Sequence, residues 1–375
     1  MRFTRPTDLA TCHFPMPNSP QFLFITCQVG AEASVKTELG RRWPDFRFAY
    51  SRPGFLTFKL PEGHDLKADF DLESIFARAY GLSLGKATGE NVDELAGQVW
   101  EVCGGRPVRR VHVWGRDAAR AGDHDFEPTI TPDALSAHAA IMRHCPGPEK
   151  LADDAHDPWS EARRGEFVLD CVLVGPHEWW VGYHRAGSVA SRWSGGMIRL
   201  ELPPDAVSRA WLKMEEALRW SRLPIHAGAR CAEIGSAPGG SSQALLSRGL
   251  IVMGIDPAEM HPRVLGHPNF THIRRRAAQV RRREFRKIRW LVADMNVAPS
   301  YTCDAVESIV TQREISIRGM LLTLKLIDPS HADRMPEHLA RVRGWGYNVV
   351  QARQLQHNRQ EVCVAALQRP FLRKS

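Results

Sequence analysis

Four charged residues stand where a folded α/β protein would ordinarily have apolar side chains. Lys213 lies beside the apolar face of a helix expected in SRAWLKMEEAL, and Lys325 lies near the end of the apolar stretch MLLTLKLID. Asp294 ends WLVAD, and Glu361 begins EVCVAAL. A buried lysine is costly to keep charged unless a carboxylate pairs with it. Two lysines and two carboxylates at one sheet edge would satisfy one another, and would hold one lysine with the lowered pKa that proton abstraction from a hydroxyl requires.

A glycine-rich turn precedes the first of these carboxylates. The sequence CAEIGSAPGG predicts a short strand at 230–234, a tight turn, and a helix from about Ser241. Glycines there would let a bulky ligand approach the backbone closely. Asp256 ends the next apolar run, IVMGID, where a carboxylate can accept hydrogen bonds from ribose hydroxyls. The residues expected to bind this ligand are Glu233, Gly235, Ser236, Ala237, Pro238, Gly239, Gly240, Ser241, Asp256 and Asp294.

The elements that must position these groups begin near Asp205, where helices start to alternate with apolar strands. This rhythm predicts a parallel sheet. The expected strands are 230–234, 251–255, 271–275, 290–295, 320–327, 348–354 and 361–368, and the clearest helix is 330–345. Only residues 355–360 separate the last two strands, so the final strand should insert antiparallel. Seven strands with one reversed is the arrangement expected of a class I methyltransferase fold, a Rossmann-like α/β sheet.

Smaller units are expected before residue 205. Residues 1–21 predict a loosely ordered lead-in, 22–90 a small α+β block, 91–186 a second α+β block, and 187–204 a linker. The second block offers Arg109, Arg110 and the pair Trp179 and Trp180 as parts of an RNA surface. Strand alternation should bury one of the two tryptophans, and we expect it to be Trp180.

The overall composition favours a soluble protein with a polyanionic partner. The 375 residues are 43% apolar and 25% charged, and the formal net charge is +8. Eight cysteines without a C-x-x-C pair indicate neither a zinc site nor a disulfide framework, so no metal is expected and a reducing, cytoplasmic compartment fits. No apolar run approaches membrane-spanning length, and no signal core is present, so neither a membrane nor export is expected. Residues 274–289 hold nine basic residues and one acidic residue; a solvated helix face and direct RNA contact both remain open.

The order of the four charged residues resembles the K-D-K-E tetrad of FtsJ-type RNA ribose 2′-O-methyltransferases. The segments SRAWLKMEEA, EIGSAPGG, LVADM, LKL and HNRQEV are similar to the RlmM family, bacterial 2′-O-methyltransferases of large-subunit (23S-type) rRNA cytidine. The resemblance runs from about Phe22 to the end, with its strong motifs after Val181. It implies S-adenosylmethionine as cofactor, large-subunit rRNA as partner, and a THUMP-like RNA-binding module in the amino-terminal blocks. It also implies the catalytic set Lys213, Asp294, Lys325 and Glu361.

Two other functions remain as alternatives. Ser241 stands where the family usually has tryptophan, and Arg276 lies near the position of an aspartate that contacts adenine; both changes suit an RNA-binding scaffold whose cofactor site has decayed. An RNA base methyltransferase is the second alternative. Amino-group methylation uses an (Asp/Asn)-Pro-Pro-aromatic motif, whereas Asp294 is followed by Met-Asn-Val. Carbon-5 methylation needs a cysteine nucleophile, and Cys303 lacks a Pro-Cys context. Ribose methylation is therefore favoured.

Overall fold

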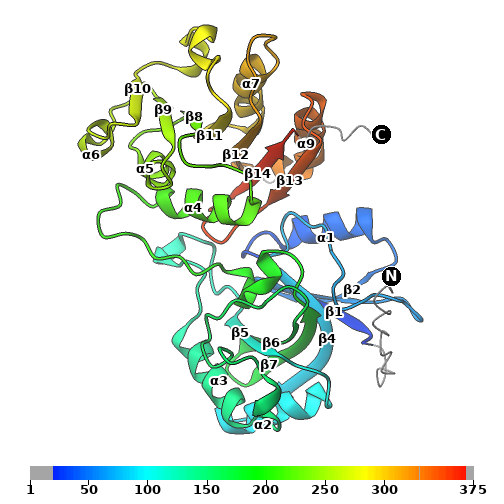
Figure 1. The fold of residues 1–375 in the computed structure, drawn as a ribbon. Coiled ribbons are helices and arrows are strands. Elements are labelled where there is room, and N and C mark those ends of the chain that lie inside the picture. The colour runs from blue at the N-terminus through cyan, green and yellow to red at the C-terminus, as the bar shows by residue number, and fades with distance from the viewer. Residues whose placement is uncertain (1–19, 329, 369–375) are drawn as a thin grey trace, which may run out of the picture.

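A computed structural model describes residues 20–328 and 330–368. The chain forms two lobes, each built on its own seven-stranded sheet (Figure 1). The lead-in expected at 1–21 lies outside the described residues except for Pro20 and Gln21. Within the described residues, no sheet continues from one lobe to the other, and the change of sheet falls between Arg185 and Arg230, on either side of the boundary expected near Asp205.

The amino-terminal lobe contains one sheet, although the sequence predicted two separate blocks. Its strands are β1 (Phe22–Thr26), β2 (Arg47–Arg52), β3 (Phe55–Lys59), β4 (Ala79–Thr88), β5 (Arg110–Gly115), β6 (Phe167–Gly175) and β7 (Glu178–Arg185), in the order β2-β3-β1-β4-β7-β6-β5. The unpredicted strand β4 pairs with both β1 and β7 and joins the two blocks. Its two glycines weaken its strand signal. Gly81 leaves room for Phe24, and Gly85 (φ +149°) adjoins a break in register.

Three helices cover this sheet: α1 (Glu32–Arg42), α2 (Val92–Cys103) and α3 (Pro132–Arg143). Both α2 and α3 begin where the sequence supplies an N-cap. The Asn91 side chain accepts a hydrogen bond from the Glu94 N–H, and the Thr131 hydroxyl accepts one from the Ala134 N–H. The buried faces of α2 and α3 pack with β5, β6 and β7 into one apolar core.

Arg110 and Trp179 were expected at an RNA surface on this lobe and are buried instead, whereas Trp180 lies in the core as expected. Arg110 is fully buried, and its guanidinium is paired with Asp154 and Glu166. Trp179 and Trp180 are both buried, because helices cover one face of β7 while Tyr50 stacks on Trp180 at the other. Arg109 remains exposed, as expected.

The carboxy-terminal lobe has the predicted alternating order of helices and strands. Its strands are β8 (Arg230–Ile234), β9 (Ile251–Ile255), β10 (Phe270–Ile273), β11 (Trp290–Asp294), β12 (Gly319–Lys325), β13 (Val349–Arg353) and β14 (Glu361–Leu367), in the order β10-β9-β8-β11-β12-β14-β13. Its helices are α4 (Ala210–Ser221), α5 (Gly240–Ser247), α6 (Pro262–Leu265), α7 (Pro299–Val310), α8 (Ser330–Asp333) and α9 (Met335–Gly344). The final strand β14 is antiparallel to both neighbours, and the other pairings are parallel. The predicted class I methyltransferase fold is confirmed.

Two local expectations in this lobe need correction. The helix expected over 330–345 is divided into α8 and α9, with Pro336 in the first turn of α9. The basic stretch 274–289 forms two short 3₁₀ turns at 277–279 and 282–285 instead of a regular helix.

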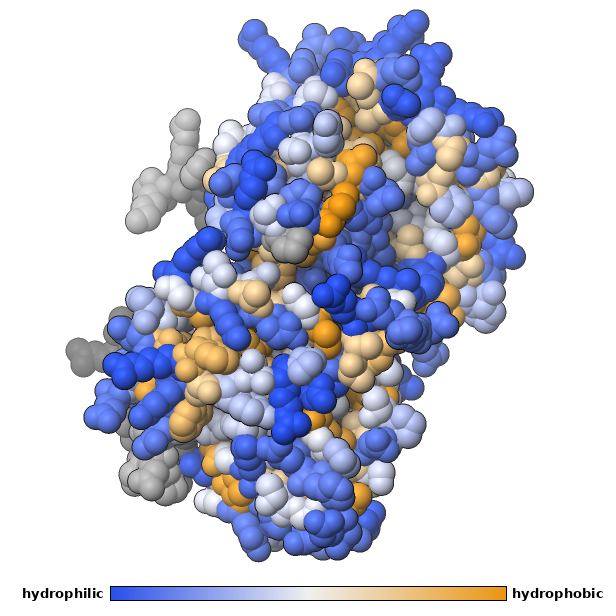
Figure 2. Space-filling model, turned by 180° about the vertical axis from the view of Figure 1, so that it is seen from behind, coloured by the Kyte–Doolittle hydropathy of each residue, from blue (hydrophilic) through white to orange (hydrophobic). Residues whose placement is uncertain are grey.

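The lobes meet through backbone contacts as well as side chains. Gln354, which follows β13, donates its N–H to the carbonyl of Ile75 at 2.8 Å, and the Arg353 guanidinium donates to the carbonyl of Arg78. The face seen in Figure 2 is largely hydrophilic, with apolar residues in small patches. Among residues 20–328 and 330–368, no helix is long and apolar enough to cross a membrane.

Candidate active site

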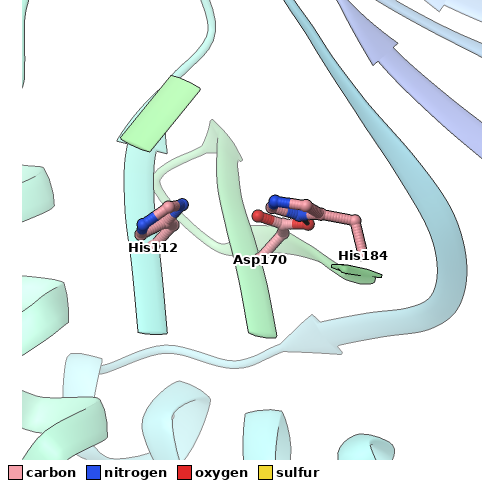
Figure 3. Close-up of side chains that lie close together, drawn as sticks. All are labelled: His112, Asp170 and His184. Carbon is pink, nitrogen blue, oxygen red and sulfur yellow. Dashed lines mark hydrogen bonds and ion pairs between the residues drawn. The ribbon is translucent and has the colours of Figure 1, made fainter. Parts of the chain in front are cut away.

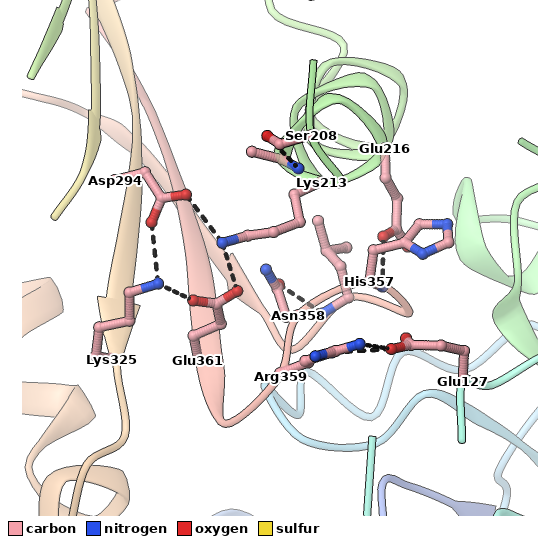
Figure 4. A network of polar contacts seen from close by, with 12 residues as sticks. Glu127, Ser208, Lys213, Glu216, Asp294, Lys325, His357, Asn358, Arg359 and Glu361 are labelled. Atoms are coloured by element: carbon pink, nitrogen blue, oxygen red, sulfur yellow. Dashed lines mark hydrogen bonds and ion pairs between the residues drawn. The ribbon is translucent and has the colours of Figure 1, made fainter. Parts of the chain in front are cut away.

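The four charged residues of the predicted tetrad meet at the carboxyl edge of the second sheet. Asp294 is the last residue of β11, and Lys325 is the last residue of β12. Glu361 opens the antiparallel strand β14 and is the register partner of Lys325. Lys213 reaches the same point from the first turn of α4 (Figure 4). A cation near a helix N-terminus opposes the helix dipole, so helix stability does not explain a lysine there.

These side chains form a closed ring in which ammonium and carboxylate groups alternate. The Lys213 Nζ lies 2.9 Å from Asp294 Oδ2 and 2.7 Å from Glu361 Oε1. The Lys325 Nζ lies 3.1 Å from Asp294 Oδ1 and also pairs with Glu361 Oε2. Each lysine therefore contacts both carboxylates, and the two pairs of opposite charges balance. Exposure of the side chains is 21% for Lys213, 18% for Lys325, 15% for Asp294 and 3% for Glu361, so the ring is partly open to solvent at every member except Glu361.

The ring holds Asp294 and Lys213 charged in spite of burial. Burial raises the pKa of Asp294, but the ammonium groups of Lys213 and Lys325 outweigh it and leave that pKa below its ordinary value. Burial lowers the pKa of Lys213, but Asp294 and Glu361 outweigh it and leave that pKa above its ordinary value. Lys213 is therefore held as a cation, and it is not the group prepared to accept a proton.

The glycine-rich turn adopts the strained shape that its sequence predicts, for a reason that differs from the prediction. Gly235 (φ +81°) and Gly239 (φ +119°) occupy the left-handed region that favours glycine. An added Cβ at Gly235 would lie 2.4 Å from the Asp294 carbonyl oxygen, and one at Gly240 would lie 2.2 Å from the Ser208 hydroxyl. The glycines are thus required first for packing of the turn against β11 and the start of α4. This packing brings the turn directly against the residue that supplies Asp294.

Asp256 organises the same turn from the end of β9. Its Oδ2 accepts a hydrogen bond from the Ala237 N–H at 3.1 Å, and its Oδ1 accepts one from the Ala258 N–H at 2.8 Å. A carboxylate has about four lone-pair positions, so it can accept further hydrogen bonds from a ligand. Pro238 is exposed, while Ser236 is buried, with its hydroxyl 3.4 Å from the Met260 sulfur.

The turn has unfilled hydrogen-bonding capacity that suits a polar ligand. Glu233 is fully buried; its Oε2 accepts a hydrogen bond from Ser242, and its Oε1 has no partner among the described residues. Burial raises the pKa of Glu233 to about 7, and the hydrogen bond from the Ser242 hydroxyl opposes this increase. Ser241 lines a small cavity together with Lys213 and Asp294, and its hydroxyl also lacks a hydrogen-bond partner within the described chain. These residues fit a cofactor that is held between the turn and the ring.

Three residues that the sequence did not single out support the loop before Glu361. Glu216 of α4 accepts hydrogen bonds from the N–H groups of Gln356 and His357, both at 2.9 Å. Asn358 caps the loop through its side-chain oxygen, which accepts from the Leu355 N–H at 3.0 Å. From the other lobe, the Gln28 side chain donates to the carbonyls of Leu355 (3.1 Å) and Asn358 (2.6 Å). A sequence signal existed only for Glu216, since KMEEA places it one helical turn after Lys213.

Comparison with known families assigns this part of the chain. Residues 206–331 match the family model described as FtsJ-like methyltransferase. The carboxy-terminal lobe contains an FtsJ-like methyltransferase domain. The matched part of this FtsJ-like domain includes Lys213, Asp294 and Lys325, whereas Glu361 lies beyond it.

Curated relatives extend the similarity beyond the FtsJ-like domain. The Ribosomal RNA large subunit methyltransferase M of Xylella fastidiosa (strain 9a5c) is 33% identical over 225 residues, which cover 58% of this chain and 61% of the relative. The protein of the same name from Laribacter hongkongensis is 32% identical over 184 residues, covering 46% of this chain and 51% of the relative. The chain thus spans about three-fifths or less of the length of these relatives.

Solved structures share only a distant likeness. TrmN from Thermus thermophilus is 14% identical with a TM-score of 0.33, and it covers 92% of this chain and 99% of its own. A putative hemolysin from Lactococcus lactis is 18% identical with a TM-score of 0.38, and it covers 44% of this chain and 90% of its own. Scores this low carry no argument about function, and the fold assignment rests on the sheet order of the FtsJ-like domain itself.

Proposed function

We propose that this protein transfers a methyl group from S-adenosylmethionine to a ribose 2′-OH of RNA, with a cytidine of large-subunit rRNA as the target. The observation that carries this proposal is the ring of Lys213, Asp294, Lys325 and Glu361, closed at the edge of a methyltransferase-type sheet beside the glycine-rich turn. The name of the curated relatives supports rRNA of the large subunit as the substrate class.

The residues of the turn would hold the cofactor. Asp256 would accept hydrogen bonds from ribose hydroxyls, and the buried Glu233 and Ser241 would face the rest of the molecule. Bound S-adenosylmethionine supplies an electrophilic methyl group on a sulfonium sulfur. The cofactor-facing side chains Ser241 and Asp294 line the same cavity as Lys213, so the turn and the ring serve one site.

Lys325 is assigned as the group that takes the 2′-hydroxyl proton. A ribose hydroxyl is a poor nucleophile, so it must be oriented and relieved of its proton as it reacts. The Lys325 Nζ accepts this proton and returns to the ammonium form, in which Asp294 and Glu361 stabilise it. Lys213 contacts the same two carboxylates and stays positive, so Asp294 and Glu361 are each shared between the two lysines.

The alternatives are less well supported by the site. Burial raises the pKa of the Cys303 thiol to about 11, which is the opposite of what a nucleophilic cysteine in carbon-5 methylation needs. Asp294 is engaged by both lysines and is followed by Met-Asn-Val, which does not suit amino-group methylation. The intact ring and the unfilled capacity of Glu233 argue against a scaffold with a decayed cofactor site.

The test is transfer of labelled methyl from S-adenosylmethionine to large-subunit rRNA, offered in parallel as naked RNA and as assembled particles. The RNA is then digested with alkali, which needs a free 2′-OH to cleave the chain. Label in alkali-resistant dinucleotides supports ribose methylation, and label in mononucleotides would show base methylation instead. Glu361→Gln is the matched negative control, because it removes one charge from the ring with little change in volume. Failure of the wild-type protein to bind S-adenosylmethionine in a calorimetric titration would favour the scaffold.

A further inference from the structure

The amino-terminal lobe holds a cluster of three buried polar groups that the proposed function does not use. His112, Asp170 and His184 have exposures of 1%, 1% and 7% and come from β5, β6 and β7. His112 and Asp170 are register partners, and His184 lies two residues from Gly182, the partner of Asp170 on β7. This register places all three side chains on one face of the sheet (Figure 3). One potential ligand atom from each lies within 4.8 Å of the other two.

The hydrogen bonds of His184 define which ring nitrogen faces Asp170. Its Nε2 lies 2.7 Å from the carbonyl oxygen of Ser191, which can only accept, so Nε2 carries a hydrogen. Its Nδ1 lies 2.6 Å from Asp170 Oδ2. A bare nitrogen lone pair would repel a carboxylate oxygen at this distance. A positive centre, either a proton or a metal ion, must therefore be shared between Nδ1 and the carboxylate.

A shared proton would leave much of the cluster unsatisfied. Both ring nitrogens of His112 and Asp170 Oδ1 are buried and have no hydrogen-bond partner in the described part of the chain. Each unsatisfied buried polar group costs about 1–3 kcal/mol, so such groups call for an explanation. A metal ion would bind one nitrogen of His112, the Asp170 carboxylate and Nδ1 of His184 together. The Ser191 carbonyl would then be the outer partner that orients a ligating histidine.

We propose that His112, Asp170 and His184 bind a divalent transition-metal ion of the Zn²⁺ class. Two imidazoles and one carboxylate are a ligand set that Zn²⁺ accepts, with a further position for water. A cavity of about 20 Å³, lined by Asp170, His184 and Ser191, adjoins the cluster and has room for one water molecule. Ligand atoms around a tetrahedral Zn²⁺ lie roughly 3.3 Å apart, so the ion requires Asp170 and His184 to separate slightly and His112 to move inward.

Two arginines near this site are already neutralised, and a third, Arg353, lines the same cavity and donates to the carbonyl of Arg78. Arg78, which lines the same cavity, forms a buried ion pair with Asp117, and Arg110 on β5 pairs with Asp154 and Glu166. The ion would tie together β5, β6 and β7 and, through the Ser191 carbonyl, the segment that follows β7. Sequence spacing predicted no metal because the ligands are distributed over three strands and include no cysteine.

The test is made on tag-free, full-length protein purified without chelators. Elemental mass spectrometry should find about one equivalent of zinc or a similar metal per chain. After removal of the metal with a chelator, titration with Co²⁺ should saturate at about one equivalent and give the visible absorption of a low-symmetry nitrogen and oxygen site. Chelation should also lower the Tm, because metal binding is coupled to folding.

Variants then locate the metal. His112→Asn and His184→Asn should each lose it, whereas His338→Asn should retain it, because His338 is a buried histidine of α9 in the other lobe. If a cluster variant fails to fold, the metal content and the Co²⁺ spectrum of the wild-type protein still decide the question. A wild-type protein without stoichiometric metal or a saturable Co²⁺ signal would overturn the proposal, and so would a folded His112→Asn protein that keeps its metal.

Discussion

Replacement of Lys325 by alanine separates its assigned chemical role from its structural one. Lys325 and Lys213 contact the same two carboxylates and have nearly equal exposure, 18% and 21%. Loss of one partner from a buried ion pair costs about 3–5 kcal/mol, but here the other lysine still bridges Asp294 and Glu361 and the ring is partly exposed. We therefore expect each alanine variant to lose only about 1–2 kcal/mol of stability, and the two losses to be similar.

The two variants should differ in turnover. Lys325→Ala removes the group assigned to the hydroxyl proton, so single-turnover methyl transfer to rRNA should slow by on the order of 10²-fold or more, which corresponds to about 2.7 kcal/mol. Lys213→Ala should slow it less, because that lysine acts through the carboxylates. S-adenosylmethionine affinity, measured by calorimetry, should hardly change for Lys325→Ala. The assignment fails if this variant transfers methyl groups at the wild-type rate, or if its activity falls only in proportion to a loss of cofactor binding.

Three further results are expected. Asp256→Ala should weaken S-adenosylmethionine binding by about 1–3 kcal/mol or more, measured by calorimetry. The change removes an acceptor for the ribose hydroxyls and also the hydrogen bond from the Ala237 N–H that supports the turn. Unchanged affinity would place the cofactor elsewhere. Burial raises the pKa of Glu216 to about 7, so the folded state retains a proton that the unfolded state loses above about pH 4.5. The free energy of unfolding should therefore fall as pH rises from about 4.5 to 7, and Glu216→Gln should reduce this slope in denaturant titrations at several pH values. An unchanged slope would refute the raised pKa of Glu216. The triple alanine variant of Arg274, Arg275 and Arg276 should lower the salt dependence of RNA binding by roughly two in the log–log slope, and an identical slope in filter binding would assign these exposed arginines to a solvated face.

The carboxy-terminal half could be predicted from the sequence because the strand and helix patterns of its individual segments agree with the arrangement of the whole sheet. Its strands are apolar runs separated by helical periods, and the short interval 355–360 sufficed to predict the reversed strand β14. Lys213, Asp294, Lys325 and Glu361 were recognisable because each interrupts an apolar pattern with a charge that needs a partner. The structure brings all four together at one sheet edge.

The amino-terminal half was harder because its organisation depends on long-range pairing. The strand β4 carries Gly81 and Gly85, so its own residues give a weak strand signal, and only its neighbours β1 and β7 specify it. Arg110 follows Arg109 and looks equally exposed in the sequence, but its partners Asp154 and Glu166 lie more than 40 residues away. Alternation along one strand likewise cannot show that both faces of β7 are covered, which is why Trp179 was expected outside the core.

The contacts of the loop 355–360 limit how independent the carboxy-terminal lobe can be. This loop positions Glu361. Its N–H groups donate hydrogen bonds to Glu216 of the same lobe, and its carbonyls accept them from Gln28 of the other lobe, which follows β1. A fragment that begins at residue 205 would retain every member of the ring but would lose the contacts that Gln28, Glu127 and Pro128 make with this loop. Any displacement of the amino-terminal lobe would act through Gln28 on the backbone next to Glu361. The two lobes are therefore better understood as a single mechanical assembly than as an enzyme with a detachable binding module.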